Sequence, residues 1–273
     1  MSYSHVLVGT DGSATAGRAV EVAARVASGV GAPLVVITAW QRHQSDPPAL
    51  SEEAKFPGGS AAAMDAQWAI ETTSDAAGTA RRLEVEDVRQ IQAIGAPVES
   101  LLESAGTHPD GLLVVGTVGL THRSERLVGN VPHQLTHHSP VDLLLCTQRD
   151  TGWERIALAT DGSRTAARAV ERGLALADAI GAEATLVTVA RTQERGEAVL
   201  DDAASRTEGL ADRPRQVIVD GDAVSGLTRG GRDYDLLVIG NKGMSGPSRL
   251  LGSVSNRITH EVPTDLLLVN TTR

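Results

Sequence analysis

Two glycine-rich stretches carry the residues whose types and spacing could do chemistry. "GNKGMSGPSRLLGSVSN" begins at Gly240 and "GTVGLTHRSERLVGN" begins at Gly116, each directly after an apolar run. A glycine lets another group come very close to the backbone. Gly-Ser at the start of a helix also offers free N–H groups, a hydroxyl and the positive end of the helix dipole. The chemistry therefore favours an anion such as a phosphate group at residues 252–255.

A simpler interpretation is a plain strand–loop–helix turn in which Ser253 is the N-cap of the helix. A single copy of the pattern would favour that interpretation. The pattern occurs twice, at corresponding places after two apolar runs, and this favours a binding site.

The elements that must position these loops are also repeated. "HVLVGTDGSATAGRAVEVAARVASGVGA" at residues 5–32 matches "RIALATDGSRTAARAVERGLALADAIGA" at residues 155–182 without a gap. The ends of the two halves match as well, closing with "DLLLCT" and "DLLLVN". The repeat predicts a tandem duplication with one domain at residues 1–150 and a second at residues 151–273.

Each half alternates apolar runs with amphipathic segments. Continuous apolar runs are typical of strands that are covered on both faces, as in a parallel sheet. We therefore expect two doubly wound α/β domains with right-handed crossovers and five parallel strands each. Gly31 is expected to stop the first helix, and Asp and Ser residues are candidates to cap it. Residues 41–59 are expected to form a Pro- and Gly-rich loop, where the second half has a more charged segment at residues 191–209.

A ligand of such a sheet binds beyond the carboxyl ends of the strands, where the strand order reverses. Three segments of each half are expected to end there: the end of the first strand, the end of the second strand and the glycine loop after the fourth. In the first half they contain Thr10, Asp11, Ala39, Gly116, Gly119, Gly129 and Asn130. In the second half they contain Thr160, Asp161, Val189, Gly240, Gly243, Gly252, Ser253, Val254 and Ser255. Simple helix capping remains the alternative role for the two aspartates.

This layout resembles the universal stress protein family in its tandem two-domain form. The resemblance rests on "VGTDGS", "LATDGS" and "DLLVIGNKGMSG…LLGSVSNRITHEVPTDLLLV", and it covers nearly the whole chain except residues 41–59. It implies a Rossmann-like sandwich of the adenine-nucleotide-hydrolase type. The family's nucleotide-binding subgroup has Gly, two residues, Gly, nine residues, then Gly-Ser or Gly-Thr. Members of that subgroup bind ATP, and some prefer cyclic AMP.

The resemblance also implies roles for the candidate residues. Asp11 and Asp161 would hold the adenine edge, and the backbone of Ala39 and Val189 would touch the ring. The glycines that follow the fourth strand would line the ribose and phosphates: Gly116, Gly119, Gly240 and Gly243. The triphosphate would lie on Gly129, Asn130 and Val131 in one half, and on Gly252, Ser253, Val254 and Ser255 in the other.

Both halves depart from the family pattern. In the first, Asn130 replaces Ser or Thr, and Pro132 stands where the second half has Ser255, which removes one N–H and one hydroxyl. In the second, "GSVS" is intact, but the loop between Gly243 and Gly252 is one residue short. The intact "GSVS" favours the second half as the binding half.

Other residues give weaker signals. His133 and His137 have a spacing that can bind zinc, but the second half retains only His260, so a solvated helix face is the favoured interpretation of this segment, which also contains His138. Arg126 and Arg249 follow the glycine loops and could reach a phosphate or cover a helix with their stems.

Composition excludes several classes of protein. The net charge is −9 and neither half has a basic block, so we expect no nucleic-acid or anionic-membrane partner. The single cysteine, Cys146, lies in the apolar run "DLLLC", and we interpret it as a buried strand residue rather than a nucleophile. A lone cysteine suits a reducing compartment, and no apolar run is long enough to span a membrane, so we expect a cytoplasmic protein.

The sequence as a whole predicts an adenine-nucleotide-binding stress or regulatory protein. The expected ligand is ATP, with AMP and cyclic AMP as alternatives, and Mg²⁺ would enter only with the nucleotide. The sequence contains no P-loop and no nucleophile elbow, so we expect no committed catalytic set. Two competing hypotheses remain: a slow ATP hydrolase, and an interaction protein whose pockets are empty. The last strand of each half would be an exposed sheet edge, so we expect the halves to pair as an internal pseudo-dimer. Association of two chains into a homodimer stays open.

Overall fold

The computed structural model describes residues 3–41, 61–117, 130–147, 152–207, 214–241 and 253–271. "First half" and "second half" below mean residues 1–150 and 151–273. The elements of the first half are β1 (His5–Gly9), α1 (Ala14–Val30), β2 (Leu34–Trp40), α2 (Ala61–Arg82), β3 (Val88–Ile94), α3 (Pro97–Gly106), β4 (Gly111–Gly116), α4 (Asn130–His138) and β5 (Asp142–Cys146). Those of the second half are β6 (Arg155–Ala159), α5 (Arg164–Ile180), β7 (Glu183–Val189), α6 (Gln193–Arg206), β8 (Arg215–Val219), α7 (Ala223–Gly230), a short 3-10 turn (Gly231–Asp233), β9 (Leu236–Gly240), α8 (Ser253–Glu261) and β10 (Asp265–Val269).

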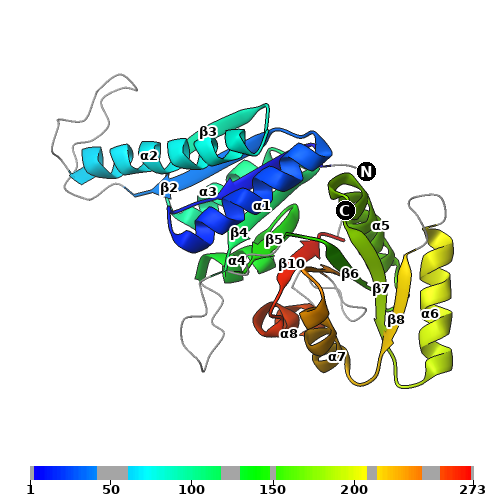
Figure 1. Cartoon of the computed structure of the whole chain (residues 1–273). Helices are drawn as coiled ribbons and strands as arrows, with labels where there is room; N and C mark the ends of the chain where they lie inside the picture. The colour runs from blue at the N-terminus through cyan, green and yellow to red at the C-terminus, as the bar shows by residue number, and fades with distance from the viewer. Residues whose placement is uncertain are drawn as a thin grey trace.

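All ten strands belong to one sheet, in the order β3-β2-β1-β4-β5-β10-β9-β6-β7-β8. Within each half the strands are parallel, whereas β5 and β10 pair antiparallel, with Leu145 opposite Leu266 and Leu143 opposite Leu268. The expected doubly wound α/β architecture is therefore confirmed, and so is the pairing of the two last strands. We call this β5–β10 junction the seam (Figure 1). The domain limits at residues 150 and 151 stay a prediction, because the sheet runs through without a break.

Helices cover both faces of the sheet, and one apolar core lies under each layer. Helices α1, α2, α5 and α6 pack on one face, over a core that includes Val6, Val8 and Leu158. Helices α3, α4, α7 and α8 cover the other face, over a core that includes Leu7 and Leu143. Successive residues of β1 thus point into different cores, as the period of a strand requires. Both cores contain residues of both halves, so the seam is covered on both faces.

The ends of α1 and α5 follow local rules that the repeat makes identical. Ser13 and Ser163 are the N-caps, and their hydroxyls accept from the N–H groups three residues on. Gly31 ends α1 in the left-handed conformation, with φ 66°, as expected of a stop signal. Asp11 and Asp161 are not the caps; each carboxylate instead accepts from the N–H of the capping serine.

One segment differs from the sequence interpretation. The sequence places residues 191–209 at the position of the loop expected at 41–59. In the structure they contain α6, and Thr192 is the N-cap of this helix. The second half therefore passes from β7 almost directly into its helix. Residues 42–60, which contain most of the expected first-half loop, lie outside the described part of the chain. In the described ranges, no helix has the length and apolar character needed to cross a membrane.

Candidate nucleotide site

A cavity of about 270 Å³ lies at the carboxyl ends of β1, β2 and β4 in the first half. We call it the first-half cavity. It is closed by the N-terminal ends of α1, α3 and α4. Its lining comprises Gly9, Thr10, Asp11, Ser13, Thr15, Ala16, Ile37, Ala39, Pro97, Leu101, Val115, Gly116, Asn130, Val131 and Pro132. This is the edge where a doubly wound sheet binds its ligands.

The expected site residues of the first half meet at this cavity. Thr10, Asp11, Ala39, Gly116, Asn130 and Val131 all line it. Gly119, Gly129 and Arg126 lie outside the described residues, so the loop that was expected to hold phosphates is not part of this geometry. The sequence analysis did not propose the apolar wall residues Ile37, Pro97, Leu101 and Val115. Pro97 could have been proposed from the sequence, because it is the first residue of the helix that follows β3.

The apolar wall and the polar rim occupy different parts of the cavity lining. Ile37, Leu101 and Val115 are buried, with 1%, 5% and 4% of their surface exposed, and they form the apolar wall. Asp11 and Asn130 are exposed and form part of the polar rim. An apolar slot with a polar mouth suits a flat ring that carries polar edges.

Hydrogen bonds hold the end of β1 in place. The N–H of Thr10 donates to the carbonyl of Ile37 at 2.9 Å, and the hydroxyl of Thr38 donates to the carbonyl of Thr10 at 2.9 Å. The carboxylate of Asp11 accepts from the N–H of Ser13 at 3.0 Å. The Asp11 side chain is therefore held at the rim while it remains exposed to a ligand.

The second half repeats this scaffold. The N–H of Thr160 donates to Val187 at 2.9 Å, the hydroxyl of Thr188 donates to Thr160 at 2.8 Å, and Asp161 accepts from Ser163 at 2.9 Å. Gly243, Gly252 and Arg249 lie outside the described residues. Ser253 and Val254 open α8, as expected for a helix that starts at the glycine loop.

Two residues of the second half are larger than their counterparts in the first-half cavity. Ala159 stands at the position of Gly9, and Val189 at the position of Ala39. The methyl groups of Val189 lie so close to α7 that a Cβ at Gly226 would approach one of them to 2.9 Å. Ser255, which was expected to hold phosphate, donates its hydroxyl to the carbonyl of Gly240 at 2.9 Å.

Gly116 has a structural role that does not depend on a ligand. A Cβ at this position would lie 2.7 Å from the carbonyl oxygen of Thr15, closer than real side chains come. The missing side chain lets the end of β4 approach the first turn of α1. Gly240 is less confined, because its Cβ would meet the carbonyl of Thr165 at 3.4 Å.

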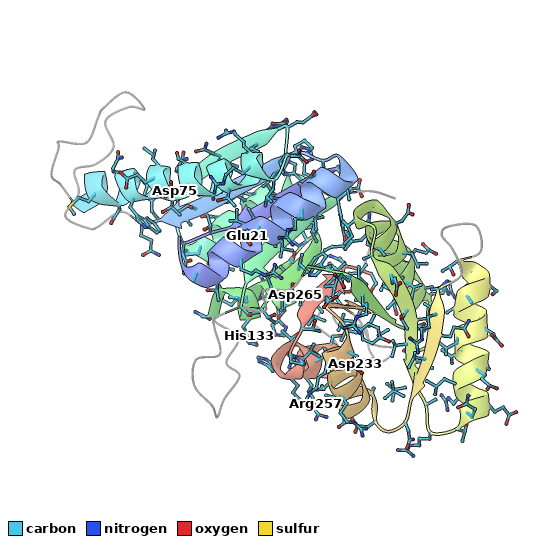
Figure 2. All side chains as sticks on the ribbon, viewed as in Figure 1. Glu21, Asp75, His133, Asp233, Arg257 and Asp265 are labelled. Carbon is cyan, nitrogen blue, oxygen red and sulfur yellow. The ribbon has the colours of Figure 1, made fainter. Side chains whose placement is uncertain are left out.

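The histidines of α4 do not form a solvated face, which corrects that expectation. His133 and His137 are half-buried, only His138 is exposed, and the Nδ1 atoms of the first two are buried without a partner. The ring of His133 lies 5.0 Å from that of His137 and 5.6 Å from that of His260 on α8, across the seam. Figure 2 shows His133 where α4 meets α8. Among the described residues, no group of three or more His, Cys, Asp or Glu side chains could hold a metal ion.

Burial and neighbouring imidazoles disfavour a charge on this cluster. Desolvation lowers the pKa of His137, and the imidazoles of His133, His138 and His260 lower it further. Desolvation likewise lowers the pKa of His260, with His133 acting in the same direction and Glu261 against it. The lowered pKa values favour the neutral form of His137 and His260 at neutral pH, so these two side chains bring no charge to the contact between the halves.

Comparison with known proteins gives one family. A model of the "Universal stress protein family" matches residues 2–147, 152–232 and 213–270. A universal stress protein of Mycobacterium tuberculosis strain H37Rv is 35% identical over 147 residues, which are 53% of this chain and 96% of that protein.

Two solved structures show the same fold over the whole chain. A universal stress protein from Archaeoglobus fulgidus has a TM-score of 0.71 at 17% identity, covering 99% of this chain and 100% of that one. A protein from Pseudomonas aeruginosa, described as a putative universal stress protein, has a TM-score of 0.71 at 16% identity, covering 98% and 93%. At these identities the likeness concerns the fold alone.

Proposed function

Because the chain belongs to the universal stress protein family, we propose that it is a regulatory protein that binds an adenine nucleotide in the first-half cavity. The observation that carries the proposal is the lining of this cavity: about 270 Å³ at the strand ends, bounded by buried apolar side chains and by exposed polar ones. A purine ring has apolar faces and polar edges, which match the wall and the rim.

Each rim residue has a role in this proposal. Asp11 accepts from the exocyclic amino group of adenine, since its carboxylate is exposed and already oriented by Ser13. The backbone of Ala39, at the end of β2, contacts the ring. The ribose and phosphates extend past Gly116 toward the start of α4, where Asn130 supplies an amide in place of the family's hydroxyl. Mg²⁺ arrives with the nucleotide, because the lining described above offers the metal only one carboxylate.

The first half is proposed over the second on steric grounds. The sequence favours the second half, through its intact "GSVS". The ring pocket depends instead on Gly9 and Ala39, and the second half has the larger Ala159 and Val189 there. The larger side chains leave less room for a ring at the strand ends of the second half, and the hydroxyl of Ser255 already donates to the carbonyl of Gly240.

The exchange of these two pairs tests the proposal. Gly9→Ala with Ala39→Val gives the first half the side chains that the second half has at these positions. Circular dichroism must first show that the variant folds, because the new Cβ at position 9 would meet the side chain of Leu101 at 3.0 Å. Titration calorimetry with Mg-ATP, AMP and cyclic AMP should show saturable binding to the unaltered protein. The variant adds three methyl groups to the pocket and should lose affinity by about tenfold or more, since a change of a single methylene group in a pocket already has an effect of that order.

The reverse exchange, Ala159→Gly with Val189→Ala, is the matched control, and it should leave first-half binding intact. Unchanged affinity in the first variant, together with a loss in Gly252→Asp, would move the site to the second half. The absence of any binding heat, with no nucleotide released when the purified protein is denatured, would favour an interaction protein. Phosphate release that disappears in the first variant would identify the slow hydrolase.

A further inference from the structure

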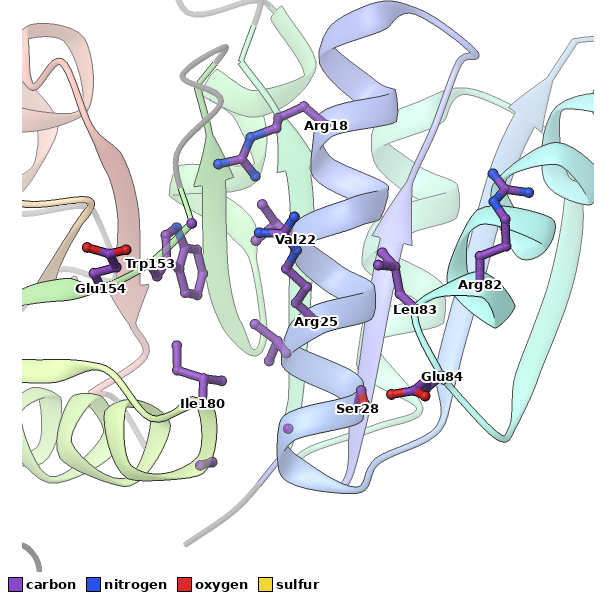
Figure 3. A pocket seen from close by; sticks show the side chains of 14 residues that line it. Arg18, Val22, Arg25, Ser28, Arg82, Leu83, Glu84, Trp153, Glu154 and Ile180 are labelled. Atoms are coloured by element: carbon purple, nitrogen blue, oxygen red, sulfur yellow. The ribbon is translucent and has the colours of Figure 1, made fainter.

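A second and larger cavity, of about 540 Å³, lies on the helical face where α1 and α5 meet across the seam. We call it the seam cavity. It is bounded by the C-terminal part of α1, by Leu83 and Glu84 after α2, by residues 152–154 before β6, and by Ala179 and Ile180 of α5 (Figure 3). Its walls therefore come from both halves, and it shares no residue with the first-half cavity.

One wall of the seam cavity is apolar and aromatic. Val22 of α1 lies on the side of the helix that faces Trp153 and Ile180 (Figure 3). Val26 belongs to the same lining, and Leu83 lines the cavity on the other side of α1. The indole of Trp153 is half-buried, and its Nε1 donates to Asp265 at 2.9 Å. That hydrogen bond fixes the plane of the ring, so the Trp153 side chain is a pre-oriented surface for stacking.

The cations of the cavity are not equivalent. Arg18 is paired with Asp265 at 3.4 Å, and Arg82 donates to Thr79 at 2.9 Å. Arg25 makes no hydrogen bond or ion pair with any other described residue, and its guanidinium lies on the side of α1 that faces Trp153 in Figure 3. Glu84 and Glu154 are exposed, so water screens their charge.

We propose that the seam cavity binds a small anion that carries a planar apolar ring, such as an aromatic carboxylate or sulfonate. The ring stacks against Trp153 over the valines of α1, and the anionic group pairs with Arg25. Arg is suited to this place because its planar guanidinium binds carboxylates and sulfonates in a two-pronged manner and contacts aromatic faces. The volume lies in the range of small-molecule sites.

Such a ligand would act on the arrangement of the two halves. It touches α1 of one half and α5 and Trp153 of the other, so it favours the docked state of these helices. This inference does not depend on nucleotide binding, because the two cavities share no lining residue.

Calorimetry with 2-naphthalenesulfonate tests the proposal, with the uncharged 2-naphthalenesulfonamide as the matched probe. Both titrations are made on the full chain in saturating Mg-ATP. The sulfonate should bind with a micromolar to millimolar Kd, and Arg25→Gln should weaken it about tenfold without a comparable effect on the sulfonamide. Arg25→Lys should recover part of the affinity, and Arg81→Gln, an exposed arginine of α2 outside the lining, should change nothing.

A blocking variant covers the case in which an arginine variant is unstable. Ser28 is exposed and lines the cavity, so Ser28→Trp should fill it and abolish binding of both probes without unfolding α1. No sulfonate binding to the unaltered protein, equal affinity in Arg25→Gln, or unchanged binding of both probes to Ser28→Trp would each overturn the proposal. Probe binding that occurs without nucleotide but is lost in saturating Mg-ATP would overturn it too, since the probe would then occupy the nucleotide cavity.

Discussion

Asp142 and Asp265, the first residues of β5 and β10, form reciprocal contacts across the seam. Asp265 accepts from the N–H of Thr147 just after β5 at 2.7 Å, and Asp142 accepts from the N–H of Asn270 just after β10 at 2.8 Å. Each carboxylate is buried and also meets an arginine of the opposite half. Arg18 lies 3.4 Å from Asp265, and Arg172 lies 3.2 Å from Asp142. The two aspartates therefore tie each half to the other.

Asp265→Ala should lower the free energy of unfolding by about 3 to 5 kcal/mol, the range for breaking a buried ion pair on one side. The change deprives Arg18 of a carboxylate partner, and it leaves the indole N–H of Trp153 and the N–H of Thr147 without their acceptor. Urea unfolding, followed by circular dichroism, measures the loss. Asp233→Ala is the control, because Asp233 is an exposed residue of the 3-10 turn before β9, and its cost should stay below about 0.5 kcal/mol.

The histidine contact between α4 and α8 should make stability fall as the pH falls below neutrality. Burial lowers the pKa of His137 and His260 from 6.5, so the unfolded chain binds protons in a range where the folded protein does not. The contribution of the two histidines to the free energy of unfolding is present above pH 6.5 and is lost as the pH falls through their folded-state pKa values.

The aspartates act in the opposite direction at lower pH. Burial raises the pKa of Asp142 and Asp265 from 3.8. Their contribution to the free energy of unfolding is therefore fully present below pH 3.8 and is lost as the pH rises through the folded-state pKa values.

Urea unfolding midpoints at pH 7.5 and 5.5 measure the effect of the histidines on stability. His137→Asn with His260→Asn should flatten that dependence, and an equally steep dependence in this variant would exclude the cluster as its source.

Two glycines of the same region should respond to alanine in opposite ways. Gly116→Ala should destabilise the protein by roughly 1 to 3 kcal/mol, because the new Cβ would lie 2.7 Å from the carbonyl oxygen of Thr15. Gly17→Ala should stabilise it by about 0.5 to 1 kcal/mol, because Gly17 is an exposed α1 residue with no heavy atom within 4 Å of its added Cβ. Thermal unfolding of both variants tests the pair, and a shift of the same sign in both would contradict the geometry.

The Cys146 thiol should not react with thiol reagents in the folded protein. The side chain is 0% exposed, and burial raises its pKa well above the ordinary value, with Asp265 acting in the same direction. Colour development with dithiobis-nitrobenzoate should therefore follow the unfolding rate at increasing urea concentrations. Rapid labelling in buffer without urea, at a rate independent of protein stability, would show that the seam strands open locally.

Strands, helix ends and strand pairing could be predicted from the sequence, and side-chain contacts across the seam could not. The repeated "TDGS" and the apolar runs predicted the strands, the helix stop at Gly31 and the pairing of the last strands, because burial on both faces leaves a composition signal. The contact between His133 and His260 has no such signal. It exists because the antiparallel register of β5 and β10 places α4 beside α8.

The candidate site shows the same division. The strand-end residues Thr10, Asp11 and Ala39 were predicted from the topology, and they do line one cavity. The preference for the second half came from "GSVS", whereas the difference in space comes from one methyl group at Ala159 and two at Val189. A change of this size in a strand end is inconspicuous in a sequence, yet under the proposed function it distinguishes the two halves. The role of Asp11 as an acceptor for Ser13 also needed coordinates, since both residues are good caps by type.

The continuous ten-stranded sheet has a consequence for how such a protein can change. In a symmetric dimer of identical chains, every substitution appears in both subunits, so a side chain that fills one pocket fills its twin. Here the two copies are separate stretches of one chain, and Gly9 and Ala159 are altered independently. One copy can lose its pocket while its strands, caps and buried aspartates still support the other. Joining the two halves in one chain thus allows one half to keep only its structural role while the other keeps a binding site.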